Sequence, residues 1–141
     1  MDIEQLQQIV DPLIERESRH GLGSLDEREQ VAYLVWCFAG QIDNGGFAQF
    51  LFNSTGAYAR ETARALREVA APLSASLLER AIQLFPGAAV LAELEERNTA
   101  VQAFPTEADA EFEALDEEFF QKESGLSYER LARYWNGQGA A

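Results

Sequence analysis

In nearly every segment of this chain, apolar residues recur every three or four positions, which is the period of an α-helix. Glycine and proline separate these segments from one another. The pattern predicts helices over residues 3–19, 24–43, 47–53, 58–70, 72–85, 88–104, 106–122 and 126–135. We therefore expect an all-α protein, a single compact domain of about six to eight helices that spans residues 1–141 and ends in a frayed tail at 136–141.

Local signals refine these boundaries. Ser24 stands three residues before Glu27, the pairing of a capping box, and Thr106 precedes Asp109 at the same spacing. Residues 31–39 are apolar on all sides of a helix, so that helix is expected to be central and buried. The glycine pair that follows it supplies backbone freedom for a sharp turn.

The chain of 141 residues carries 24 acidic and 11 basic side chains, a formal charge of −13, while 47% of its residues are apolar. This apolar content excludes a disordered acidic tail. The acidic surplus argues against direct binding to nucleic acid or to an anionic membrane, and it favours a basic protein as the partner. The first residues lack the basic and apolar regions of a signal peptide, and the longest apolar run is far shorter than the ~20 residues of a membrane span. We therefore expect a cytoplasmic protein.

Few side chains in the sequence are suited to catalysis. His20 is the single histidine, which excludes a monomeric di-iron bundle because that site needs two Glu-x-x-His motifs. Cys37, the single cysteine, lies in the most apolar segment and is expected to be a small buried hydrophobe. The alternating acids of residues 109–113 lack the glycine that a calcium loop needs, and no phosphate-binding loop is present. We therefore predict no catalytic residue, no metal and no cofactor.

The negative charge is concentrated late in the chain. Residues 93–123 hold eleven acids and two bases, which accounts for −9 of the −13. The acids of residues 107–123, placed on one helix, give about one charge per 3 Å of axis, against one per ~3.4 Å on a DNA strand. Two interpretations remain open, a face that binds a basic partner or a solvated face that keeps the protein soluble. The acids expected to contact a partner are Glu93, Glu96, Glu107, Asp109, Glu111, Glu113, Asp116, Glu117 and Glu118.

The predicted turn carries a distinctive run, Asn44-Gly45-Gly46-Phe47-Ala48-Gln49-Phe50-Leu51-Phe52-Asn53-Ser54-Thr55-Gly56, preceded by Val31-Ala32-Tyr33-Leu34. This segment resembles the signature of the DMP-type DNA-mimic protein family, a bacterial group also classed as a domain of unknown function. The likeness extends over roughly residues 27–135. It implies an acidic, all-helical, dimeric domain whose surface carboxylates imitate DNA phosphates and occupy the DNA-binding face of a transcription regulator.

The signature residues themselves are expected to be structural. The glycine pair permits the turn, two phenylalanines pack in the core, and three amides satisfy the backbone around the junction. These residues are Asn44, Gly45, Gly46, Phe47, Gln49, Phe50 and Asn53.

Together these features predict a non-catalytic acidic binding protein, a DNA mimic that occupies the DNA-binding surface of a transcription regulator or another basic protein. Two alternatives remain. An immunity-type inhibitor of a basic toxin or nuclease would bind its target without competing with DNA. An enzyme with a site near residues 44–53 would have only amide, hydroxyl and carboxylate groups to use.

Overall fold

The computed structural model describes residues 1–137, and these residues form seven α-helices joined by short 3-10 turns, with no strand. The predicted all-α class is confirmed. Residues 138–141 of the predicted frayed tail lie outside the described residues. The helices are α1 (Ile3–His20), α2 (Glu27–Leu51), α3 (Ala59–Glu68), α4 (Pro72–Ile82), α5 (Leu94–Ala100), α6 (Ala108–Lys122) and α7 (Leu126–Trp135). Within residues 1–137 no helix combines the length and the apolar character that a membrane crossing requires.

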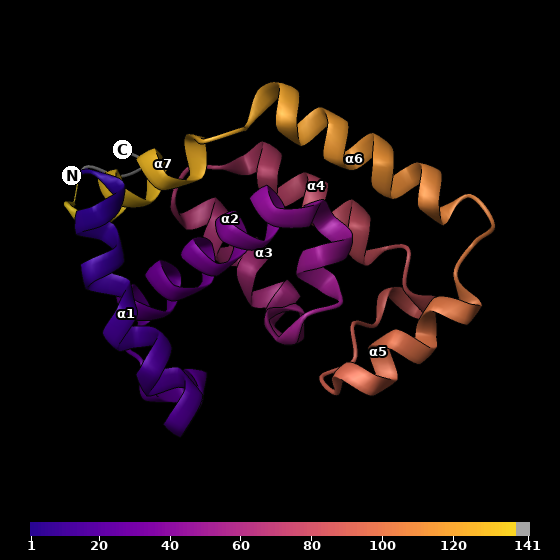
Figure 1. The fold of residues 1–141 in the computed structure, drawn as a ribbon, viewed down its shortest axis with the longest axis horizontal. Coiled ribbons are helices and arrows are strands. Elements are labelled where there is room, and N and C mark those ends of the chain that lie inside the picture. Colours follow the sequence, from indigo (N-terminus) through magenta and orange to yellow (C-terminus); the bar gives the residue numbers. More distant parts are fainter. Residues whose placement is uncertain (138–141) are drawn as a thin grey trace.

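Helix α2 is the centre of the molecule, as its apolar middle predicts. It contacts α1, α3, α6 and α7 (Figure 1). Its fully buried Phe38 packs against three other rings, with centroid distances of 6.1, 5.4 and 5.9 Å to Phe47, Phe50 and Phe119. Because Phe119 belongs to α6, this aromatic cluster fixes α6 against both halves of α2.

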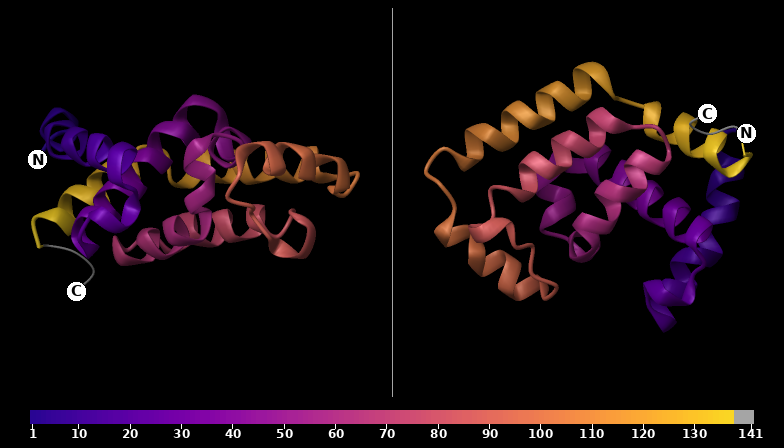
Figure 2. Two further views of the ribbon diagram at one scale, coloured as in Figure 1. Left: turned by 90° about the horizontal axis from the view of Figure 1, so that it is seen from below. Right: turned by 180° about the vertical axis from the view of Figure 1, so that it is seen from behind.

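Different helices form the two ends of the molecule. Helices α1 and α7 contact each other at one end, and α5 lies at the opposite end (Figures 1 and 2). Helix α6 runs along the outer edge between these ends, so one long side of it is turned away from the rest of the fold (Figure 2). The segment richest in acids therefore lies at the periphery of the protein.

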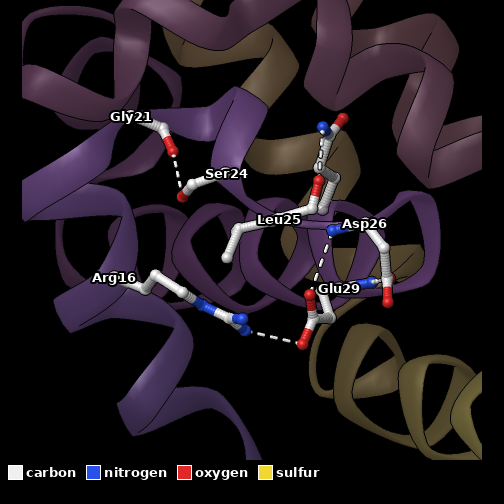
Figure 3. A network of polar contacts seen from close by, with 7 residues as sticks. Arg16, Gly21, Ser24, Leu25, Asp26 and Glu29 are labelled. Atoms are coloured by element: carbon white, nitrogen blue, oxygen red, sulfur yellow. Dashed lines mark hydrogen bonds and ion pairs between the residues drawn. The ribbon is translucent and has the colours of Figure 1, made fainter.

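The junction between α1 and α2 corrects the predicted start of the second helix (Figure 3). Asp26, and not Ser24, is the N-cap: its carboxylate accepts the Glu29 N–H at 2.8 Å, and the Glu29 carboxylate accepts the Asp26 N–H at 3.0 Å. Ser24 belongs to a 3-10 turn, where its hydroxyl donates to the Gly21 carbonyl at 2.7 Å. Glu29 also pairs with Arg16 of α1 at 2.6 Å, so the cap ties the two helices together.

The predicted helix over residues 88–104 is wrong in its first third. Only Leu94–Ala100 is α-helical, followed by a 3-10 turn at Val101–Ala103. Ala88 has a left-handed φ of 54°, which a continuing helix does not allow, and the carbonyls of Leu91 and Ala92 bond to the Arg97 side chain at 2.8 Å each. A buried side chain thus takes the acceptors that a helical ladder would have used.

The start of α6 also departs from the prediction. The N-cap is Glu107, which makes no side-chain cap hydrogen bond, so Thr106 does not cap the helix. Asp109 and Glu111 instead occupy the first turn, where negative charge interacts favourably with the helix dipole.

Candidate functional site

The candidate site is the acidic surface of α5 and α6. Helix α6 turns one side to the core through Ala108, Phe112, Leu115 and Phe119, all of which are buried. Eight of the nine acids predicted to bind a partner fall outside that side, on α6 or around the start of α5, while the carboxylate of Asp116 turns toward α2. Seven of the nine are exposed, namely Glu93, Glu96, Glu107, Asp109, Glu111, Glu113 and Glu117, and two are half-buried, namely Asp116 and Glu118.

Three of the exposed acids, Asp109, Glu113 and Glu117, form what we call the acidic stripe. They recur every four residues along one side of α6, so successive carboxylates rise by about 6 Å along the helix axis. Among the ion pairs found within residues 1–137, none involves a member of the stripe. The exposed ring of Phe120 follows the stripe at its C-terminal end. The stripe is therefore a row of solvated charges that are available to an external cation.

Glu118 lies on a different side of α6 and has partners in its own chain. Its carboxylate lies 3.5 Å from Arg80 of α4 and 3.4 Å from Lys122. These contacts are weak individually, but they neutralise the charge of Glu118, whereas none of these ion pairs involves a member of the stripe.

Glu123 is buried and so does not contribute to the row of surface charges expected from the sequence. It caps the C-terminal end of α6, and only 3% of its surface is exposed. Its carboxylate accepts from the Ser74 hydroxyl at 2.9 Å and from Arg130 at 2.9 Å. Burial opposes ionisation, but the hydrogen bonds from Arg130 and Ser74 together outweigh it and hold the pKa of Glu123 below its ordinary value. This charge joins α4, α6 and α7 and is not part of the outer surface.

The carboxylate of Asp116 lies against the glycine pair at which α2 breaks, and this contact accounts for the glycine at position 46. The helix breaks at Gly45 and Gly46, and the Phe47 N–H that begins the second half donates to the Asp116 carboxylate at 2.8 Å. Gly46 has a φ of 78°, and a Cβ on it would lie 2.3 Å from Asp116 Oδ2. Burial raises the pKa of Asp116, and nearby Glu113 raises it further, while the hydrogen bond from Phe47 opposes both. An acid of α6 thus caps a helix that begins inside α2.

The remaining signature residues surround this break. Phe47 and Phe50 are fully buried in the aromatic cluster, and Asn44 is exposed. The side-chain amides of Gln49 and Asn53 donate to the side chain of Gln41, at 3.1 and 2.7 Å. These two amides therefore bond to another side chain, whereas the sequence analysis expected them to bond to the backbone.

The backbone at the end of α2 is satisfied by Arg97, a residue that sequence reasoning treated as an ordinary surface base. Its guanidinium is fully buried and donates to the Leu51 carbonyl at 3.0 Å and to the Asn53 carbonyl at 2.6 Å, besides the two carbonyls before α5. Burial lowers the pKa of Arg97, and Glu93 partly offsets this. A lone arginine inside an acidic run was the available signal for such a role.

The groups most suited to nucleophilic chemistry are held in unreactive forms. Burial is the main cause that raises the pKa of the Cys37 thiol to about 12, so the thiolate needed for attack is scarce at neutral pH. The Glu17 carboxylate accepts hydrogen bonds from the hydroxyls of Tyr33 at 2.9 Å and Tyr58 at 2.8 Å, which joins α1 to α2 and to the turn before α3.

In the part of the chain that the structure describes, no three His, Cys, Asp or Glu side chains gather in a metal-binding arrangement.

Comparison with known proteins gives one family. A family model described as DMP19-like protein matches residues 23–138, most of the chain. No curated protein and no solved structure shows a significant match. The family match agrees with the resemblance noted from the sequence.

Proposed function

We propose that this chain, which belongs to the DMP19-like protein family, is a non-catalytic binding protein that acts as a DNA mimic. In this proposal the acidic stripe occupies the DNA-binding surface of a transcription regulator or another basic protein. The observation that carries the proposal is the stripe itself, three exposed carboxylates in a row that have no ion-pair partner within residues 1–137.

The geometry of the stripe is compatible with a phosphate row. Its carboxylates rise by about 6 Å each, close to two steps of the ~3.4 Å axial spacing of charges on one DNA strand. Glu107 and Glu111, also exposed, add charge on another side of α6. Lysine and arginine side chains placed to reach phosphates would therefore meet carboxylates at comparable intervals.

The stripe also has an energetic cost that a partner relieves. Like charges four residues apart on a helix destabilise it by about 0.2–0.5 kcal/mol per pair. A cationic partner replaces this repulsion with attraction, and the attraction weakens as salt screens the charges, over about 8 Å at physiological ionic strength. We therefore expect binding that depends steeply on salt.

A pull-down from native lysate tests the proposal. The purified protein is immobilised, washed across a salt gradient, and each retained protein is tested for displacement by duplex DNA. We expect a DNA-binding protein that is retained at low salt, lost at high salt and displaced by DNA. A basic toxin or nuclease that is retained but not displaced by DNA would instead support the inhibitor function. An empty eluate accompanied by a co-purified small molecule would favour an enzyme and overturn the proposal.

A further inference from the structure

A hollow of about 240 Å³ lies beside the acidic stripe. Three phenylalanine rings line it, Phe52 at the end of α2, Phe104 before α6 and Phe112 on α6, together with Ala48 and Val101. Asp109, the first member of the stripe, is the only acid among its lining residues. An aromatic surface and a carboxylate therefore meet in one concave site.

The walls of this hollow are held in place by packing. The Phe104 ring lies 6.1 Å from Phe52 and 6.2 Å from Phe112, and it packs edge to face on the buried Phe85 at 4.8 Å. Arg97 fixes the chain on both sides of Phe52, because it binds the carbonyls of residues 51 and 53. A ligand would thus enter a site that needs little ordering, which lowers the entropic cost of binding.

These features fit a long cationic side chain. An alkyl stem can pack on apolar walls while its charged head remains near water, and a cation gains further from the face of an aromatic ring. A guanidinium suits the site better than an ammonium, because it is planar, stacks on rings, is weakly hydrated and binds a carboxylate through two donors. Asp109 supplies that carboxylate at the point where the hollow joins the stripe.

We propose that this hollow binds an arginine side chain of the protein partner, with the alkyl stem against the phenylalanine rings and the guanidinium on Asp109. The proposal rests on the proposed function for the partner, while recognition of arginine is a property of the hollow and needs no partner to be tested. The hollow anchors one particular residue, and the rest of the stripe attracts cations in general.

The experiment titrates ¹⁵N-labelled protein with N-acetyl-arginine N-methylamide and follows the backbone amide shifts. The matched ligand is the citrulline analogue, which has the same length and shape but no charge. We expect arginine to shift the amides of Ala48, Phe52, Val101 and Asp109, and citrulline to bind about twofold to fivefold more weakly, the range of a partly exposed ion pair. Equal affinities, or shifts spread along the stripe outside the hollow, would overturn the proposal.

Two variants locate the charge. Asp109→Asn should weaken arginine binding by the same twofold to fivefold and leave citrulline binding unchanged. Glu111→Gln removes one charge from another side of α6 and should leave the arginine affinity as it is. Equal weakening by both variants would mean general attraction to an acidic surface and would contradict a specific site. Ala48→Leu, which fills the hollow, should abolish the arginine shifts.

The arginine titration and the pull-down test different claims, so one can fail while the other succeeds. Citrulline and arginine binding alike, beside a DNA-competed pull-down, would overturn the arginine site and leave the DNA-mimic function standing. Selective arginine binding with no DNA-displaced partner would support the site and contradict the mimic function.

Discussion

The substitution Gly46→Ala probes the contact that joins α6 to the break in α2. Gly46 has φ 78° and ψ −166°, a backbone region that is essentially restricted to glycine, and a residue with a side chain loses about 1–3 kcal/mol there. The new Cβ would also lie 2.3 Å from Asp116 Oδ2, so the carboxylate must move away from the Phe47 N–H that it caps. Loss of a hydrogen bond to a charged acceptor costs about 1.5–3 kcal/mol. We expect Gly46→Ala to lower the free energy of unfolding by about 2.5–6 kcal/mol.

Two other glycines separate these contributions. Gly87 has φ 64° and ψ 19°, the left-handed helical region, and nothing lies within 4 Å of the position that a Cβ would take, so Gly87→Ala should show only the conformational cost of that region, about 1–2 kcal/mol. Gly40 lies inside α2 with open space around it, and Gly40→Ala should stabilise the protein by about 0.5–1 kcal/mol. Urea unfolding followed by circular dichroism measures all three, and unchanged m-values show that the same transition is compared.

A double-mutant cycle then tests the cause. In an Asp116→Ala background the carboxylate is absent, so Gly46→Ala should cost only the conformational ~1–3 kcal/mol. The reasoning is refuted if Gly46→Ala costs no more than Gly87→Ala, or if its full cost persists when Asp116 has been removed.

Three further predictions concern the buried ions and the stripe. Arg97→Met should lower the free energy of unfolding by about 3 kcal/mol or more, because four carbonyls lose the guanidinium that donates to them. Arg97→Lys should not restore the lost stability, because an ammonium cannot reproduce the fork of guanidinium donors. Urea titration measures the stability of both variants. The pKa of Glu123 is lower in the folded protein than in the unfolded chain, so the ionised carboxylate stabilises the fold at any pH above the unfolded-chain pKa. This stabilisation is lost as the pH falls from the unfolded-chain pKa through the folded-state pKa. The difference in unfolding free energy between wild type and Glu123→Gln should therefore shrink between these two pKa values when stability is measured in a pH series. Changing Glu113 and Glu117 of the stripe to glutamine removes both like-charge pairs and keeps Asp109 in the first turn of α6, so it should stabilise the protein by about 0.5–1 kcal/mol at low salt and have no effect at about 1 M salt, which thermal unfolding would show.

Periodicity predicted the fold well where breakers marked both ends of a helix. The first helix, between Asp2 and Gly21, and the last, from Leu126 to Trp135, agree with the structure almost to the residue. The prediction failed at residues 88–93, where the Arg97 side chain takes the carbonyls and no local pattern reveals it. Local propensity thus identified the helices, and tertiary contacts decided where some of them begin.

The candidate site was predictable only as a segment. Charge counting located the acids on α5 and α6, but it gave the same weight to acids with very different surroundings. Asp116 bonds to a backbone N–H 69 positions away, and Glu123 bonds to Ser74 at a separation of 49. Such partners lie far apart in the chain and meet only in the folded protein, so the sequence could not separate structural acids from the exposed stripe.

The central claim, that the acidic stripe binds where DNA binds, is tested most directly by a competition titration. A DNA-binding protein captured in the pull-down is saturated with labelled duplex DNA, and release of the DNA is measured as each variant is added. The stripe variant changes Asp109, Glu113 and Glu117 to lysine. The control variant, of equal net charge, changes the exposed Glu4, Asp11 and Glu68 to lysine. We predict that wild type and control release the DNA at similar concentrations and that the stripe variant releases none. Equal release by the two variants would contradict the claim.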